Sequence, residues 1–343
     1  MNNSAIGTKK LRSIKRKAVS VSNQQLTNES FFENQPIPLI IQANKIKLNL
    51  VSWAVDNRKL INTHLHQKGA ILFRGFQLTG INEFEEFMNS LFGNLLDYSY
   101  GSTPRSKLNG KIYTSTEYPP EQSIPLHNEM SYTSSWPSKI AFYCVKAADK
   151  GGATPIADSR KIFQKIAPKI RKKFQGKGVM YVRNYGEELD LPWQKVFQTN
   201  SKLDVENYCK KNKIQFKWIG DILKTRQVCQ GVVEHPQSKE MVWFNQAHLF
   251  HISSLNSLIR NSLLEVFTED ELPRNAYYGD GSSLETSVLK EIRNIYQQEA
   301  ITFPWQSGDL LLLDNLLTAH GRMPFIGSRK VVVGMSDLTS SGE

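Results

Sequence analysis

The pair His127 and Glu129 has the residue types and the spacing of a metal-binding pair. In an extended chain, side chains two positions apart point to the same face, so both can reach one ion while Asn128 faces away. A third ligand must come from elsewhere, and His320 follows directly on the apolar stretch 310–317. Two histidines and one carboxylate form the facial triad of non-haem Fe(II) sites. We therefore predict His127, Glu129 and His320 as iron ligands and catalytic residues; the alternative is a chance pair with structural histidines.

Two further residues have the chemistry of an anion anchor. Arg329 lies nine positions after His320, beyond a turn rich in Pro and Gly, where its guanidinium could hold a carboxylate bidentately. Thr154 follows a Gly-Gly-Ala run and offers a hydroxyl as a second donor to the same carboxylate. Arg322 has two possible roles: it could make a second contact with the carboxylate, or it could form a structural hydrogen bond.

Four other side chains are candidates for contact with a substrate. Tyr113 and Ser115 precede the metal pair and are predicted to form a wall of the pocket. Asn245 follows an aromatic pair, where it could bond a substrate or simply cap a helix. His248 could line the pocket from a helix face.

The elements that must position these residues fall in two groups. Helical periodicity dominates the middle of the chain, from about residue 160 to 305. Strand composition occurs before residue 150 and after residue 300, in residues 70–76, 111–116, 140–145, 309–314 and 329–337. This order predicts an α+β protein with one catalytic domain over residues 36–343, whose β-structure is split by a long helical insertion.

Five segments in this order carry a resemblance to a known family: residues 69–76, 126–129, 151–155, 243–245 and 320–329. The chain resembles the Fe(II)/2-oxoglutarate-dependent dioxygenases of the taurine dioxygenase (TauD/TfdA) family. It is most similar to a branch of peptide-natural-product pathways related to the syringomycin-pathway hydroxylase. Glu129 departs from the taurine enzyme, which has Asp there, but Glu is usual in that branch.

The resemblance implies a double-stranded β-helix, or jelly roll, with flanking helices. It implies Fe(II) as cofactor, 2-oxoglutarate as cosubstrate held by Thr154 and Arg329, and dioxygen. The expected reaction is hydroxylation of an unactivated C–H bond of an amino acid or amino-acid-derived unit, free or bound to a carrier protein, in natural-product biosynthesis. Desaturation or cyclisation by the same catalyst is one alternative, and a non-catalytic binding protein with this fold is another.

Charge is unevenly distributed along the 343 residues, whose formal net charge is +11. Six Lys and Arg residues lie within residues 9–17, and the first acidic residue is Glu29. We predict a basic, disordered tail over residues 1–35, either a solvated arm or a contact for an acidic carrier protein, and no nucleic-acid partner. The three cysteines form no CxxC pair, and no run of 18 apolar residues occurs. We therefore expect a cytoplasmic protein with reduced thiols and no membrane contact.

Overall fold

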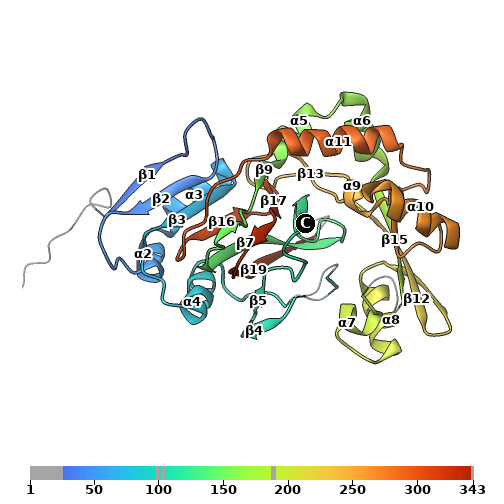
Figure 1. The fold of residues 1–343 in the computed structure, drawn as a ribbon, viewed down its shortest axis with the longest axis horizontal. Helices are drawn as coiled ribbons and strands as arrows, with labels where there is room; N and C mark the ends of the chain where they lie inside the picture. The colour runs from blue at the N-terminus through green and yellow to red at the C-terminus, as the bar shows by residue number, and fades with distance from the viewer. Residues whose placement is uncertain (1–25, 98–99, 102–104, 187–190, 341–343) are drawn as a thin grey trace, which may run out of the picture.

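The largest element of the structure is an eight-stranded sheet, which fills the left half of Figure 1. The computed structural model describes residues 26–97, 100–101, 105–186 and 191–340. Early and late parts of the chain alternate in this sheet. In spatial order the strands are β1 (Thr27–Ser30), β2 (Leu39–Ala43), β3 (Ala70–Arg74), β16 (Leu310–Asp314), β7 (Ser135–Lys146), β19 (Lys330–Ser340), β5 (Ile112–Thr114) and β4 (Lys107–Asn109).

Strand β16 lies in the middle of this sheet, antiparallel to both β3 and β7. Successive side chains of a strand point to opposite faces, so the four leucines 310–313 divide between two cores. Leu310 and Leu312 pack in the cluster that contains the apolar faces of three helices, whereas Leu311 and Leu313 pack on the opposite face. Those helices are α2 (Leu50–Asp56), α3 (Arg58–Lys68) and α4 (Ile81–Phe92).

A smaller, three-stranded sheet carries the residues of interest. Its central strand is β17 (Thr318–Arg322), which pairs antiparallel with β6 (Ile124–His127) on one side and β9 (Ile156–Asp158) on the other. The short pair β8 (Lys150–Gly151) and β18 (Phe325–Ile326) follows at the end of β17.

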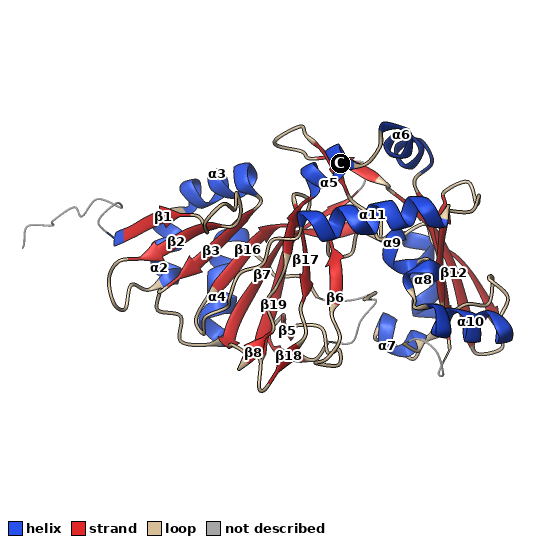
Figure 2. Cartoon of the chain, turned by 45° about the horizontal axis from the view of Figure 1, so that its top comes forward, coloured by secondary structure: helices blue, strands red, loops and turns tan. Residues whose placement is uncertain are grey.

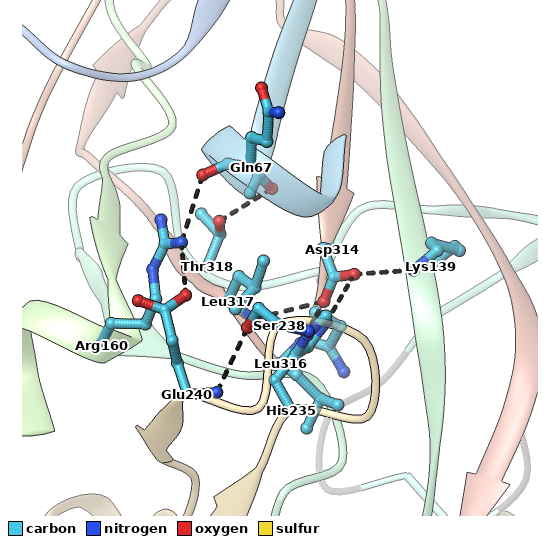
Figure 3. A network of polar contacts seen from close by, with 12 residues as sticks. Gln67, Lys139, Arg160, His235, Ser238, Glu240, Asp314, Leu316, Leu317 and Thr318 are labelled. Carbon is cyan, nitrogen blue, oxygen red and sulfur yellow. Dashed lines mark hydrogen bonds and ion pairs between the residues drawn. The ribbon is translucent and has the colours of Figure 1, made fainter. Parts of the chain in front are cut away.

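The turn from β16 into β17 is fixed by a buried polar network (Figure 3). Lys139 Nζ donates to Asp314 Oδ2 at 2.7 Å, and His235 Nε2 lies 3.3 Å from the same oxygen. Asp314 Oδ1 accepts the backbone N–H groups of Leu316 and Leu317. The carboxylate therefore shapes the turn that leads the chain into β17.

The insertion between β9 and β16 differs from the expected helical segment. It contains a four-stranded antiparallel sheet in the order β11 (Gln215–Ile219), β12 (Ile222–Cys229), β10 (Val179–Tyr185) and β15 (Arg274–Tyr278). The insertion also contains a hairpin, β13 (Val232–Glu234) and β14 (Met241–Trp243), which forms a separate two-stranded sheet. The signal for β11 was the alternation of half-buried Phe216 and Trp218 with exposed neighbours, a period of two that favours a strand.

Helices surround the insertion sheet. Helix α11 runs from the region of β17 to the insertion sheet in Figure 2 and contacts α5, α9 and β9. The helices are α5 (Ser159–Lys165), α6 (Pro168–Lys177), α7 (Trp193–Phe197), α8 (Lys202–Lys211), α9 (Ala247–Phe250), α10 (Ser257–Val266) and α11 (Thr286–Glu299), with a short 3-10 turn η1 (Ile252–Ser254). The mixed α+β class is thus confirmed, and the insertion contains a four-stranded sheet in addition to the expected helices.

The predicted tail over residues 1–35 is also corrected. Residues 27–30 form β1, which pairs with β2, so the fold begins before residue 36. The basic run 9–17 lies outside the described residues. The three cysteines are buried free thiols. Within the described ranges, no helix is long and apolar enough to cross a membrane.

Candidate metal centre

Three predicted ligands converge at the pairing of β17 with β6. His320 and His127 are direct partners across these strands, and their ring centroids are 4.7 Å apart. His320 Nε2 lies 3.7 Å from Glu129 Oε2. One ligand atom from each of the three residues lies within 4.8 Å of the others, a spacing that one metal ion can bridge. The structure thus brings together residues that the sequence separates widely.

Glu129 reaches this point by a different route from the one expected. Strand β6 ends at His127, and Glu129 stands in the turn that follows, so the pair is not part of one extended strand. Asn315 holds this turn from the opposite side: its Oδ1 accepts Glu129 N–H at 2.8 Å, and its Nδ2 donates to Glu129 O at 2.9 Å. Asn128 faces away, as predicted, and donates to Ser159 and to the Asn315 carbonyl.

Each histidine ring is held in the orientation that a ligand needs. His127 Nδ1 lies 2.8 Å from the carbonyl of Pro125, which leaves Nε2 free of that bond to face the site. Burial, followed by the neighbouring His320, lowers the pKa of His127 to about 4, so its imidazole is neutral at pH 7. The neutral ring is the form that binds metals. Phe142 packs against His320 with ring centroids 4.9 Å apart.

Gly321 explains how β17 approaches β6 so closely. A Cβ atom at this position would lie 2.6 Å from the carbonyl oxygen of Ile124, a contact that side chains do not tolerate. The glycine between His320 and Arg322 therefore permits the pairing that aligns the two histidines.

Arg105 is a site residue that the sequence analysis missed. Its Nη2 donates to Glu129 Oε2 at 2.6 Å, and both side chains are buried. Burial alone would raise the pKa of Glu129, but the Arg105 guanidinium and the two histidines hold it well below its usual range. Glu129 is therefore ionised at neutral pH. No pattern near residue 105 indicates this contact, because strands β4, β5 and β6 lie between Arg105 and Glu129 in the sequence.

A cavity opens beside the histidines, and none of the described residues that line it is acidic. Its lining consists of Arg105, Ser115, Thr116, Ile124, His127, Phe142, Thr154, His320, Gly321, Arg322 and Arg329. Three guanidiniums thus face one small space, an arrangement suited to anionic ligands.

Arg329 meets the conditions expected of a carboxylate anchor. Its Nε donates to the carbonyl of Gly152 at 3.0 Å, and Nη2 lies 3.5 Å from Thr154 Oγ1. Burial lowers the pKa of Arg329 to about 10, which still leaves it charged at pH 7. Among the described residues no carboxylate pairs with it. Gly152, with a φ of +70°, lets the arginine lie against the turn, since a Cβ there would be 3.0 Å from Arg329 Cδ.

Arg322 lines the same cavity, but both of its Nη atoms already donate to backbone carbonyls. Nη1 donates to Tyr118 O, and Nη2 donates to Pro119 O and Gln122 O at 2.6 and 2.7 Å. Of the two roles left open for it, these bonds favour the structural one.

The four candidate substrate residues differ in whether they line the cavity. Ser115 lines the cavity, whereas Tyr113, Asn245 and His248 do not. The Tyr113 hydroxyl lies 3.3 Å from Asp97 Oδ1. Asn245 bridges Gly231 O and Ala247 N–H, which is the helix-start role named as its alternative. The structure therefore places Tyr113 and Asn245 outside the lining of this cavity.

His248 is likewise structural. Its Nε2 lies 3.2 Å from the carbonyl of Leu126, and its ring stacks on Tyr296. Burial lowers the pKa of His248 to about 3. It supports β6 from behind, one residue before His127, and does not face the cavity.

Two histidines and an ionised carboxylate beside a cationic cavity form the ligand set of the mononuclear non-haem iron oxygenases. The chain belongs to the taurine catabolism dioxygenase TauD, TfdA family, which matches residues 33–335. It is therefore a dioxygenase that depends on iron and 2-oxoglutarate and acts on a small-molecule substrate with dioxygen.

Relatives are known from several organisms. The dapdiamide synthesis protein DdaC of Enterobacter agglomerans is 42% identical over 278 residues, covering 81% of this chain and 84% of that protein. A clavaminate synthase-like protein of Arabidopsis thaliana is 28% identical over 334 residues, covering 90% of this chain and 96% of that one. The crystal structure of PvcB from Pseudomonas aeruginosa shares the fold, with a TM-score of 0.51, 13% identity, and coverage of 90% and 94%.

Proposed function

We propose that this dioxygenase hydroxylates an unactivated C–H bond of an amino acid or amino-acid-derived unit in natural-product biosynthesis. The observation that carries the proposal is the 42% identity to a dapdiamide synthesis protein over most of both chains. The proposal includes the syringomycin-type branch as its closest functional group. It also treats the eight-stranded and three-stranded sheets as the two faces of a double-stranded β-helix.

In this proposal the iron ligands are His127, Glu129 and His320, the residues whose ligand atoms lie within 4.8 Å of one another. Arg329 and Thr154 bind the distal carboxylate of 2-oxoglutarate through charge-assisted and hydroxyl hydrogen bonds. Iron with 2-oxoglutarate and dioxygen supplies the oxidant for the C–H bond, and 2-oxoglutarate leaves as succinate and carbon dioxide.

The protein's own part is to bind and to orient. Pro125 and Phe142 keep the histidine rings facing the ion, while Asn315 fixes the turn of Glu129. Ser115 and Thr116 line the cavity and offer hydroxyls toward a substrate.

Two other functions are compatible with this fold. Desaturation or cyclisation uses the same residues, so only the product distinguishes it from hydroxylation. A non-catalytic protein would need neither the ligand set nor a buried Arg329 without an acidic partner in the described chain, and their coexistence favours an active enzyme. An acidic carrier protein that docks on the basic run 9–17, and a cytoplasmic location, remain predictions.

The test is a mass-shift screen of free and carrier-tethered amino acids with Fe(II), ascorbate and 2-oxoglutarate. A product that gains one oxygen atom, with matching succinate release, supports hydroxylation. Loss of two hydrogens would instead indicate desaturation or cyclisation. His320→Ala is the inactive control, and absence of metal-dependent succinate release from the unmodified protein with every candidate would contradict the proposal.

A further inference from the structure

A groove lies between α3, the last turn of α4, strands β7 and β19 and the loop that joins β13 to β14. Its volume is about 480 Å³, which is within the range of small-molecule binding sites, and none of the described residues lines both this groove and the cavity at the metal centre. Lys139 of the groove and Ala141 lie on one face of β7, whereas Phe142, which packs against His320, points to the opposite face. The groove and the metal centre are therefore on opposite faces of the sheet.

Two charged side chains of the groove, Arg58 and Asp337, have no ionic partner among the residues that the structure describes. Lys139 also lines the groove, but its charge is balanced by Asp314 at 2.7 Å (Figure 3). The side chain of Arg58 donates to the carbonyl of Ser90, which carries no net charge. The groove thus offers a cation and an anion, both uncompensated by described residues, to a bound molecule.

These two charges lie toward opposite ends of the groove. Arg58, Asn62 and His66 follow one another at intervals of four residues on one face of α3, so the first and the last are separated by about 12 Å at about 1.5 Å per residue. Lys139 acts electrostatically on both His66 and Asp337, which places Asp337 at the His66 end. Burial, followed by Lys139, lowers the pKa of His66, so its ring adds no charge at pH 7.

Uncharged polar side chains line the same groove and are not used inside the protein. Within the described ranges, the side chains of Asn62, Asn89, Ser138 and Gln237 form no hydrogen bond with another residue. An amide side chain both donates and accepts hydrogen bonds, and a hydroxyl does the same. Peptide groups have this combination of a donor and an acceptor, so a peptide backbone matches the groove in hydrogen bonding as its charged termini match it in charge.

We propose that this groove is a second binding site, which takes a short peptide with free termini: the carboxylate pairs with Arg58 and the ammonium group pairs with Asp337. Because both side chains reach into the groove, the ligand spans less than the distance of about 12 Å, which corresponds to two or three residues at about 3.5 Å each. A single amino acid is too short to engage both charges. The inference does not depend on the proposed hydroxylation, since no residue of the metal centre takes part.

The experiment titrates the full-length protein with triglycine by isothermal calorimetry at low salt. N-acetyl-triglycine lacks the ammonium charge, triglycinamide lacks the carboxylate charge, and glycine is the short control. Arg58→Gln and Asp337→Asn are compared with Lys59→Gln and Asp56→Asn, which remove the same charges from exposed positions outside the groove lining. Asparagine tolerates the φ of +57° at residue 337, so this variant keeps the local backbone.

In the unmodified protein and in both controls, triglycine should bind at least about tenfold more tightly than glycine or either blocked peptide, because each of these lacks a charge-assisted contact. Arg58→Gln should erase the preference over triglycinamide and keep the preference over N-acetyl-triglycine. Asp337→Asn should do the reverse. Binding should persist after addition of Mn(II) and 2-oxoglutarate, which occupy the cavity at the metal centre and leave the groove open.

Three results would overturn the assignment. One is the absence of saturable binding of triglycine to the unmodified protein. Another is an affinity for triglycine that is unchanged in both Arg58→Gln and Asp337→Asn. The third is displacement of the peptide by Mn(II) and 2-oxoglutarate, which would place it in the cavity at the metal centre. Peptide binding that follows the expected pattern in a protein that releases no succinate would contradict the proposed hydroxylation alone.

Discussion

His320 lies directly opposite His127 in the antiparallel pairing of β17 with β6. The two rings face one site because both residues occupy the same side of this strand pair. A slip of one residue in the pairing would turn His320 to the other face of the sheet. The register is secured on the other side of β17 as well, where His320 pairs with Ile156 of β9.

Removal of either histidine should abolish iron binding. We expect His127→Ala and His320→Ala to lose at least about tenfold in Fe(II) affinity and all turnover, because each deletes one of three ligands. Anaerobic Fe(II) titration and metal analysis of the purified protein measure this. His64→Ala is the matched control, since His64 lies away from the site and pairs with Glu29. Normal iron content in both ligand variants would refute the assignment.

Arg329→Ala should weaken binding of 2-oxoglutarate selectively. Loss of a charge-assisted, bidentate contact costs roughly 1.5–3 kcal/mol, which corresponds to about tenfold or more in the apparent constant. Steady-state succinate release at varied 2-oxoglutarate concentration measures this apparent constant. The Fe(II) affinity should stay close to that of the unmodified protein. Arg171→Ala, an arginine that packs over Phe163, serves as control. An unchanged constant would transfer the role to Arg322.

Asn315→Ala should lower the affinity of the site for a metal ion, although Asn315 is not itself a proposed ligand. Its amide donates to Glu129 O and Pro137 O and accepts from Glu129 N–H, so all three groups lose a buried partner. Changes of this kind weaken metal binding by about 10–100-fold. Isothermal titration with Mn(II) measures the effect. Asn109→Ala, at an exposed asparagine pair, should leave the affinity unchanged; equal affinities in the two variants would contradict a supporting role for Asn315.

Asp314→Asn should change both stability and its dependence on pH. Burial would raise the pKa of Asp314, but Lys139 and His235 hold it well below its usual range. A carboxylate with a lowered folded pKa contributes stability above its unfolded value, about 3.9, and loses it as pH falls toward the folded pKa. The free energy of unfolding of the variant should therefore no longer fall in this way as the pH is lowered. At pH 7 it should be lower by about 3–5 kcal/mol, since Lys139 is left buried without its carboxylate partner.

Urea unfolding between pH 7 and pH 3 measures the effect of Asp314→Asn. Asp221→Asn is the control because its ion pair with Lys202 is fully exposed and should contribute nothing measurable. An identical pH profile for Asp314→Asn and the unmodified protein would show that the ion pair does not govern acid stability.

Deletion of residues 1–20 tests the basic run. If the substrate is carried on an acidic protein, the deletion should lower kcat/KM several-fold at low salt and much less at high salt, because steering is screened over about 8–10 Å. Substrate-independent 2-oxoglutarate turnover should not change. Equal kcat/KM of the two forms on a confirmed carrier-bound substrate at low salt would identify the run as a solvated arm.

The sequence was informative where a chemical function requires particular residue types in a particular order and spacing. The convergence of His127, Glu129 and His320 could be predicted from their residue types and order, and the structure places their ligand atoms within 4.8 Å of one another. Arg329 lines the adjoining cavity. The contact of Arg105 with Glu129 could not be predicted, since it depends on how the strands between these two residues fold and no local pattern indicates it.

Other differences from the expectations have physical causes. Asn245 donates to the carbonyl of Gly231, and His248 Nε2 lies 3.2 Å from the carbonyl of Leu126, so both side chains contact buried backbone groups. Most of the insertion sheet was missed because helices separate β10 from β11 and β12 from β15 in the sequence, although the alternation in β11 was visible.

The pairing of β17 with β6 also sets an order of events during biosynthesis. The two histidines are separated in the sequence by the entire insertion, and all of its residues are translated before β17. Closing so long a loop is entropically unfavourable until the surrounding core forms. The nascent chain therefore holds at most two of the three proposed ligands until β17 has been translated, so the three-ligand site can assemble only after that point.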